Sequence, residues 1–240
     1  MEFKVVIPAH YASARLPGKV LLEVRGRPII EYVYNQACGS GAGQVIIATD
    51  DMRIADAAEA FHAEVCLTSD RHMSGTDRIA EVAQRYAWEG DTIIVNLQGD
   101  EPMMPGANVR QVASNLYNRT DVSMSTLCTA LKGEGEIRDR NVVKVIHDEN
   151  HVALGFSRDA RTFGQPGSHT VYRHLGIYAY RAGFLCRFTQ WPRSMLERQE
   201  SLEQMRALEH GVLIHVELCQ ALPGIGVDTR EDYEALLEIM

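Results

Sequence analysis

The sequence has few cysteines, and their arrangement suits neither a metal site nor a disulfide framework. The five cysteines are an odd number, lie far apart in the chain and include no Cys-x-x-Cys pair. A zinc site and a disulfide-stapled fold are therefore not indicated. Unpaired, scattered cysteines favour a reducing compartment, and we expect a cytoplasmic protein.

Long apolar runs and an excess of positive charge are also absent. No apolar stretch approaches the length of a secretory signal or a membrane span, so no membrane partner is expected. The 32 acidic residues outnumber the 24 basic ones, which gives a net charge of −8. Nucleic-acid binding needs a clustered basic surface, so no nucleic-acid partner is expected either. Any anionic ligand must be met by a local group of cations.

The chain does contain strand-length apolar runs that alternate with segments of helical period. Residues 4–8, 45–48, 65–67 and 92–97 have the pattern of strands, and the segments between them place apolar residues on one helical face. Such alternation is typical of βαβ units around a parallel sheet. We therefore predict an α/β fold whose first half is doubly wound.

The alternation weakens in the second half of the chain. Residues 157–170 carry turn formers and no period, which predicts a loop near a site or a mobile flap. A strand is expected over His174–Tyr180, a single helix over Met195–His210 with Gly211 as its cap, and a strand over Leu213–Leu218.

A basic loop follows the first strand. The segment from His10 to Lys19 is rich in small residues, which let backbone N–H groups approach an anion, and Arg15 and Lys19 add positive charge. Its spacing matches neither the P-loop nor the dinucleotide-binding Gly-x-Gly-x-x-Gly pattern. Two interpretations stay open here: a different kind of nucleotide-phosphate loop, or a surface loop with two solvated cations.

Two aspartates stand where a metal-dependent reaction would need them. Asp100 comes just beyond a buried strand, at the edge of an open α/β sheet where ligands bind. Asp228 lies in a glycine-rich turn before Thr229-x-x-Asp232, which resembles a helix capping box. Magnesium is commonly held by one or two carboxylates and phosphate oxygens. The alternative for Asp228 is a purely helix-stabilising charge.

Several segments occur together in a specific order. They are Ala48-Thr49-Asp50, Ser74-Gly75-Thr76-Asp77-Arg78, Gln98-Gly99-Asp100-Glu101-Pro102, Phe156-Ser157-Arg158, His174 to Arg181, Ser201 to Arg206 and Pro223–Thr229. With the basic loop, and over Val5 to Leu236, the chain resembles the CMP-Kdo synthetases, the 3-deoxy-manno-octulosonate cytidylyltransferases. That family transfers CMP from CTP to an eight-carbon 2-keto sugar acid for bacterial surface polysaccharide, either lipopolysaccharide or capsule.

The resemblance implies the architecture and the reaction. It implies a mixed, mostly parallel sheet of the Rossmann-like nucleotidyltransferase type with a smaller inserted β/α region, in one domain of residues 1–240. The nucleotide-binding core would be about residues 1–150 and 211–240, and about residues 151–210 would bind the sugar and form a homodimer. The sugar hydroxyl would displace pyrophosphate directly at the α-phosphorus of CTP, without a covalent enzyme intermediate.

The resemblance also implies roles for individual residues. Catalysis would involve Arg15, Lys19 and Asp100, with Mg²⁺ held by Asp100 and Asp228. The nucleotide would be bound by Ala9, His10, Ser13, Arg15, Lys19, Ala48, Thr49, Ser74, Arg78 and Gln98. The sugar acid would be bound by Arg158, His174, Tyr178, Glu203 and Gln204, since an arginine suits a carboxylate and the other side chains suit hydroxyl groups. Taken alone, His174 also fits an ordinary hydrogen-bonded strand histidine.

Two departures from the family pattern leave alternatives. His10 stands where the family usually has arginine, so it either contributes a titrating charge or only orients a neighbour. The segment after Arg158 is shorter than usual, which leaves the 8-amino analogue of the sugar as a second acceptor. A non-catalytic nucleotide-binding relative is the other alternative. A sugar-1-phosphate nucleotidyltransferase is disfavoured, because it needs no arginine for a carboxylate.

The homodimer expectation rests on apolar residues in the second half. Candidates for the contact are one face of the helix predicted over Met195–His210 and the preceding Phe184, Leu185, Phe188 and Trp191. The alternative is that this helix simply packs on the sheet.

Overall fold

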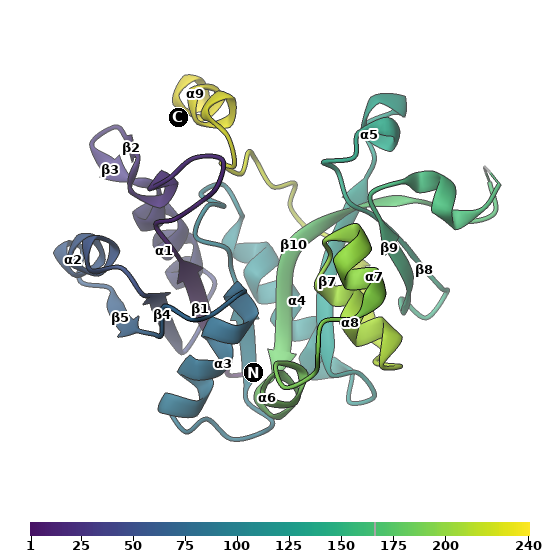
Figure 1. The fold of residues 1–240 in the computed structure, drawn as a ribbon, viewed down its shortest axis with the longest axis horizontal. Helices are drawn as coiled ribbons and strands as arrows, with labels where there is room; N and C mark the ends of the chain where they lie inside the picture. The colour runs from purple at the N-terminus through teal and green to yellow at the C-terminus, as the bar shows by residue number, and fades with distance from the viewer. Residues whose placement is uncertain (166) are drawn as a thin grey trace.

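Parallel strands form one half of the main sheet. The computed structural model describes residues 1–165 and 167–240, and the main sheet of this described part has nine strands (Figure 1). β1 (Lys4–Ala9) pairs in parallel with β4 (Gln44–Thr49) on one side and with β6 (Ile93–Asn96) on the other. β4 also pairs in parallel with β5 (Glu64–Leu67). The four strands predicted in this half are confirmed, with ends that differ by one residue at most.

The other half of the sheet is mixed. β10 (Tyr172–Arg181) runs antiparallel to both β6 and β7 (Met124–Ala130), and β11 (Ile214–Leu218) lies parallel to β7. Along the path β11-β7-β10-β6-β1-β4-β5, every described pairing except those of β10 is therefore parallel. This confirms the mixed, mostly parallel α/β fold. β8 (Lys144–His147) pairs with β10 and with β9 (Ala153–Ser157), and β2 (Glu23–Val24) and β3 (Arg27–Pro28) form a separate hairpin.

Helices cover both faces of the sheet (Figure 1). Because successive side chains of a strand point to opposite faces, Val5 and Ile7 join one hydrophobic core and Val6 joins the other. The first core lies under α1 (Ile29–Gly39) and α4 (Gly106–Asn118), and the second under α3 (Gly75–Arg85) and α6 (Ala182–Phe188). The remaining helical segments are η1 (Lys19–Leu21), α2 (Met52–Ala60), α5 (Glu134–Arg138), η2 (Ala160–Phe163), α7 (Met195–Glu200), α8 (Gln204–Glu209) and α9 (Arg230–Ile239).

The prediction of one continuous helix over Met195–His210 is wrong. α7 ends at Ser201, whose backbone is left-handed with φ 54°, and α8 begins three residues later. The break directs Leu202 into the core and brings Glu203 and Gln204 to the start of α8. An ion pair of 2.7 Å between Arg206 and Glu197 joins the two helices across the break.

The expectation that Phe184, Leu185 and Phe188 are available to a partner is also wrong. All three are almost fully buried on α6, which packs against α3 within the chain's own core. Trp191 is half-buried and its ring stacks on His210, with 4.1 Å between the ring centroids. The apolar character of this region is thus explained largely by packing on the sheet.

The structure places the loop predicted over 157–170 between β9 and β10. It contains the short turn η2, and Pro166 lies outside the described residues. Residues 151–210 also supply β10, which lies between β6 and β7 in the middle of the sheet. None of the described helices has the length and apolar character that crossing a bilayer requires.

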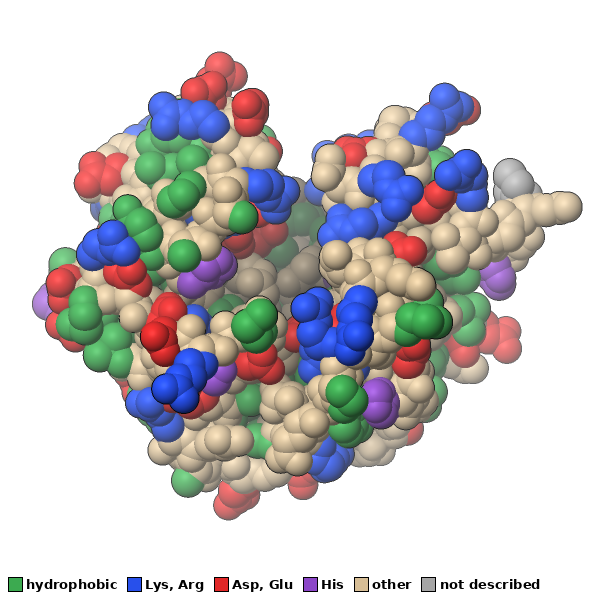
Figure 2. Space-filling view, viewed as in Figure 1, with side chains coloured by type: hydrophobic (Ala, Val, Ile, Leu, Met, Phe, Trp, Pro, Cys, Tyr) green, Lys and Arg blue, Asp and Glu red, His purple; other side chains and the backbone are tan. Residues whose placement is uncertain are grey.

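A cleft opens at the carboxyl ends of the parallel strands. Figure 2 shows this hollow between the part of the molecule around β1 and α9 and the part around α5, β8 and β9. Lys and Arg side chains lie along its rims, and acidic side chains lie deeper (Figure 2). The loops that follow β1, β4 and β6 meet at this edge because those strands run in the same direction.

Candidate active site

The basic loop is folded back so that Lys19 points into the molecule. The N–H groups of Ser13 and Gly18 both donate to the carbonyl of Tyr11, at 2.9 and 2.8 Å. Gly18 has φ 71°, and a Cβ there would lie 2.8 Å from the Tyr11 ring, so the turn requires glycine. Lys19 follows at the start of η1 with its side chain only 6% exposed, whereas the side chain of Arg15 is 58% exposed.

Lys19 lies between the two aspartates predicted to hold a metal. Its Nζ is 2.8 Å from Asp228 Oδ1 and forms a close ion pair with Asp100. Arg15 pairs with the other oxygen of Asp228 at 2.8 Å. Burial alone would lower the pKa of Lys19, but the carboxylates of Asp100 and Asp228 raise it above its ordinary value. Burial raises the pKa of Asp228, but the neighbouring Lys19 and Arg15 lower it more, so the net shift is downward. Lys19 and Asp228 are therefore both charged at neutral pH.

A backbone hydrogen bond joins the two acidic segments. The N–H of Val227 donates to the carbonyl of Asp100 at 2.8 Å, which brings the glycine-rich turn against the end of β6. Asp100 and Asp228 both border a hollow of about 660 Å³, together with Arg15 and Arg173. Two accessible carboxylates suit Mg²⁺ that takes its remaining ligands from phosphate and water. The described residues contain no group of three or more His, Cys, Asp or Glu placed to hold a metal by themselves.

Glu101 is a site residue that the sequence reasoning missed. Burial, reinforced by the charges of Asp100 and Asp228, raises its pKa to about 7. It borders the same hollow, and a Cβ at Gly226 would lie 2.8 Å from its Oε1, which explains a glycine at that position. The sequence signal that could have identified Glu101 is its position in the segment Gln98-Gly99-Asp100-Glu101-Pro102, of which only Asp100 was assigned a role.

Four of the ten residues predicted to bind the nucleotide border a second hollow of about 410 Å³, called the nucleotide pocket below. His10, Ser74, Arg78 and Gln98 border it, as do Tyr11 and Arg53, two residues that the sequence did not single out. The guanidinium of Arg53 lies 3.3 Å from the centre of the Tyr11 ring, a cation–π contact. Ser74 also caps α3 by accepting a hydrogen bond from the N–H of Asp77 at 3.1 Å.

The other residues predicted to bind the nucleotide do not border this hollow. Ala9 and Ala48 are buried strand residues. Thr49 is fully buried, and its hydroxyl accepts a hydrogen bond from the N–H of Asp51 at 3.2 Å. Ser13 is half-exposed in the basic loop. Arg78, which does border the pocket, is buried. Its guanidinium donates a hydrogen bond to the Thr68 hydroxyl and forms an ion pair of 3.1 Å with Asp50.

The structure brings together three of the five predicted sugar-binding residues, and a fourth, Gln204, adjoins Glu203 in the chain. The rings of His174 and Tyr178 lie 5.4 Å apart on β10, and the negative charge of Glu203 acts on Tyr178 from the junction of α7 and α8, where Gln204 follows. Burial lowers the pKa of His174 to about 3, so its ring is neutral, and it shares a hydrogen bond of 3.0 Å with Thr126.

This group contains buried polar atoms that lack a hydrogen-bond partner. They are the hydroxyl of Tyr178, Oε1 of Glu203 and Nε2 of Gln204. Buried polar atoms are usually paired, and the exceptions in a native structure need an explanation. A ligand rich in hydroxyl groups would supply the missing partners.

Arg158, the fifth predicted sugar-binding residue, is held elsewhere. Its Nε donates to the carbonyl of Glu200 at 2.9 Å, and its Nη1 donates to the carbonyl of Arg140 at 3.1 Å. It borders a separate hollow of about 400 Å³ with Arg140 and Arg161. Its role at the sugar carboxylate stays a prediction.

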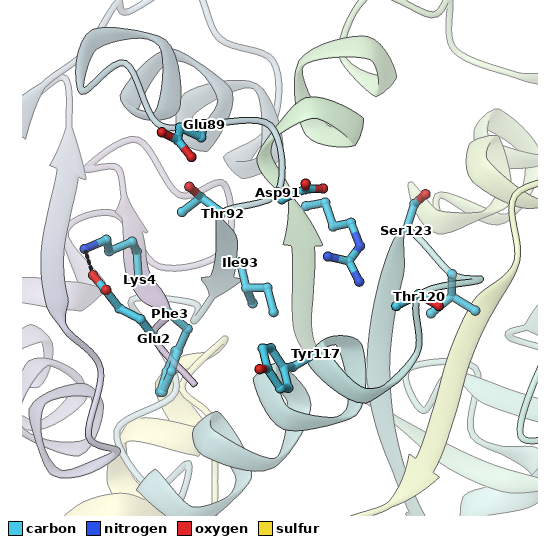
Figure 3. Close-up of a pocket in the computed structure, with 12 residues that line it drawn as sticks. Glu2, Phe3, Lys4, Glu89, Asp91, Thr92, Ile93, Tyr117, Thr120 and Ser123 are labelled. Carbon is cyan, nitrogen blue, oxygen red and sulfur yellow. Dashed lines mark hydrogen bonds and ion pairs between the residues drawn. The ribbon is translucent and has the colours of Figure 1, made fainter.

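A larger hollow lies at the opposite end of the parallel strands. Its volume is about 830 Å³, and Figure 3 shows Glu2 and Lys4 paired on one side of it, with Tyr117 and Ile93 nearby. It is bordered by the amino ends of β1 and β6. Ligands of open α/β sheets bind at the carboxyl ends, so we place the active site in the cleft.

Comparison with known proteins identifies the family of the chain. The family model for cytidylyltransferases matches residues 4–214. The 3-deoxy-manno-octulosonate cytidylyltransferase of Tolumonas auensis is 49% identical over 242 residues, which cover 98% of this chain and 95% of that protein. The enzyme of that name from Vibrio vulnificus is 48% identical over 248 residues, covering 100% and 98%. A solved structure of CMP:2-keto-3-deoxy-manno-octonic acid synthetase complexed with CTP is 38% identical, covers 100% of this chain and 98% of that one, and superposes with a TM-score of 0.91. Because the family model covers most of the chain and relatives of this name are nearly half identical to it over its whole length, the chain belongs to the 3-deoxy-manno-octulosonate cytidylyltransferase family.

Proposed function

We propose that this protein couples CTP to 3-deoxy-manno-octulosonate (Kdo), giving CMP-Kdo and pyrophosphate. The observation that carries the proposal is the placement of Lys19 between Asp100 and Asp228, at the strand edge that also holds the nucleotide pocket. The fold and the relatives support it, since the structure with a TM-score of 0.91 was solved with CTP. The arrangement offers fixed cations for the phosphates and carboxylates for a metal.

The reaction forms one bond and breaks one. The anomeric hydroxyl oxygen of the sugar bonds to the α-phosphorus of CTP, the bond from that phosphorus to the bridging oxygen breaks, and pyrophosphate leaves with the electron pair. Arg15 and Lys19 stabilise the negative charge that develops on the leaving phosphates. Asp100 and Asp228 would hold Mg²⁺, which when bound supplies a Lewis acid at the phosphates. The proton of the attacking hydroxyl passes to solvent.

The acceptor would be recognised mainly by hydrogen bonds. Tyr178, Glu203 and Gln204 each present an unpaired polar atom, and neutral His174 can exchange a hydrogen bond without adding charge. Arg158 would meet the sugar carboxylate once its backbone contacts are exchanged for the ligand. The 8-amino analogue of Kdo is the alternative acceptor, because the segment after Arg158 is shorter than is usual in the family.

The proposal includes assembly and location. We expect a homodimer, for which the half-buried Leu196 and Leu208 and the ring of Trp191 offer apolar surface. We place the reaction in the cytoplasm, where CTP is made. The described cysteines are all free, as expected in a reducing compartment.

Pyrophosphate release tests the proposal. CTP is supplied with Kdo, with its 8-amino analogue, or with a sugar 1-phosphate, each with and without Mg²⁺. We expect release with Kdo that depends on Mg²⁺, and none with the sugar 1-phosphate. Release with the sugar 1-phosphate, or no release with either 2-keto acid, would overturn the proposal.

A further inference from the structure

The first turn of α3 lies between the nucleotide pocket and the group of sugar-binding residues. Ser74, which caps the helix, and Arg78 both border the nucleotide pocket. Thr76, between them in sequence, is directed toward the junction of α7 and α8, where its hydroxyl donates a hydrogen bond to Oε2 of Glu203. One helical turn therefore contacts both substrate sites.

Thr76 belongs to a buried polar network in an otherwise apolar core. It is only 2% exposed. Burial raises the pKa of Tyr180, as does the charge of Glu203, while hydrogen bonds with Thr76 and Asn96 oppose this shift. Nε2 of Gln98 in turn donates to Oδ1 of Asn96 at 2.9 Å, and Gln98 borders the nucleotide pocket. The polar side chains thus run from the nucleotide pocket to Glu203.

Thr76 supplies the close hydrogen bond to the Glu203 carboxylate, and Ser74 adds a second interaction. The other carboxylate oxygen, Oε1, lies 3.7 Å from Arg206 and has no hydrogen-bond partner. Arg206 is already engaged with both oxygens of Glu197, at 2.8 and 2.7 Å, so it is committed elsewhere. Burial raises the pKa of Glu203, and hydrogen bonds from Thr76 and Ser74 counter that rise by stabilising the ionised form.

We propose that Thr76 is a positioning residue whose hydroxyl fixes the Glu203 carboxylate to receive a hydroxyl group of the sugar acid. It also ties that carboxylate to the helix that borders the nucleotide pocket. Thr76 touches neither substrate in this role and acts through Glu203. The inference rests on the proposed function, because it presupposes that Glu203 binds the acceptor.

Two substitutions separate the hydroxyl from the shape of the side chain. Thr76→Val keeps the branched shape and removes the donor, whereas Thr76→Ser keeps the donor. We expect Thr76→Val to raise the KM for Kdo about ten-fold, the loss typical of one hydrogen bond to a charged group, with the CTP KM changed less than two-fold. Thr76→Ser should restore the Kdo KM to within about three-fold of the unsubstituted protein.

A pH profile adds a readout that a merely structural role would not move. Without the Thr76 donor the ionised form of Glu203 is less stable, so its pKa rises further. The increase in Kdo KM on acidification should therefore begin at a higher pH in Thr76→Val than in Thr76→Ser. In a Glu203→Gln background, Thr76→Val should have much less than its ten-fold effect, because the charged acceptor is gone.

The outcomes distinguish failure of the inference from failure of the proposed function. If the unsubstituted protein turns over no 2-keto sugar acid, the proposed function fails and the inference falls with it. If it uses the 8-amino analogue, the same ratios are measured with that acceptor. If it is active and Thr76→Val raises both KM values equally, leaves the Kdo KM unchanged, or only lowers the melting temperature, the inference alone is overturned. CTP binding by each variant, measured directly, shows that it is folded.

Discussion

The two proposed substrate sites, a phosphate side and a sugar side, differ in the kind of side chain that forms them. The phosphate side consists of charged groups: the buried Lys19 and the more exposed Arg15, Asp100 and Asp228 form ion pairs that, under the proposed function, a triphosphate and a metal would replace. The sugar side contains an uncharged His174 and buried polar atoms of Tyr178, Glu203 and Gln204 that lack hydrogen-bond partners. The attraction between opposite charges depends only weakly on orientation, whereas hydrogen bonds between buried groups require a particular orientation. The supporting network is accordingly found on the sugar side.

The largest expected effect is on the phosphate side. Asp100→Asn and Asp228→Asn should each lower kcat about a hundred-fold or more, since each removes charge from the proposed metal site. Lys19 keeps one carboxylate partner in either variant, so the melting temperature should change little. Steady-state rates over a Mg²⁺ series, together with thermal melts, check this. A variant that retains full turnover would remove its residue from the metal site.

A smaller effect is expected at Arg158. Arg158→Lys keeps the charge and loses the planar fork, so the Kdo KM should rise about ten-fold while the CTP KM stays nearly constant. Arg161→Lys is the matched control, because Arg161 borders the same hollow and its exposed side chain pairs with Asp159. Initial rates measured with each substrate varied in turn give both KM values for Arg158→Lys and for Arg161→Lys, in which neither KM should change. A larger rise in the CTP KM would reject the carboxylate assignment.

The smallest effect concerns stability rather than turnover. The pKa of His174 is lowered by burial to about 3, against about 6.5 in an unfolded chain. The unfolded chain therefore binds more protons between these values, and stability is lost as pH falls below about 6.5. At pH 5 the loss relative to pH 8 should be about 2 kcal/mol greater than in His174→Gln. Urea unfolding at both pH values measures it, and equal losses in the two proteins would contradict a buried neutral histidine.

Much of the phosphate side could be predicted from the sequence. Parallel strands deliver their following loops to one edge, so a basic loop after β1 and an aspartate after β6 were expected to meet. The ion pair of Asp228 with Lys19 was not predicted, because residues that distant in sequence carry no local signal. Glu101 was missed because its raised pKa arises from burial and neighbours that only the fold provides.

The sugar side was less predictable. The apolar spacing from Leu196 to Leu208 continues through Ser201, so periodicity suggested one helix, although the left-handed backbone at Ser201 divides it. No Gly or Pro marks that break. The apolar residues of α6 looked available for a partner because sequence alone cannot show that α3 covers them. The local sequence pattern of β10 likewise does not show that this strand runs antiparallel to β6, because strand direction is set by the topology of the sheet.

The most direct test of the division between the two sides is a crossed pair of substitutions. Lys19→Ala and Glu203→Gln are compared with the unsubstituted protein, and KM is measured for CTP and for Kdo in each. The account predicts that Lys19→Ala weakens CTP binding and lowers kcat with little change in the Kdo KM, and that Glu203→Gln raises the Kdo KM alone. Both substitutions acting on the same substrate would contradict it.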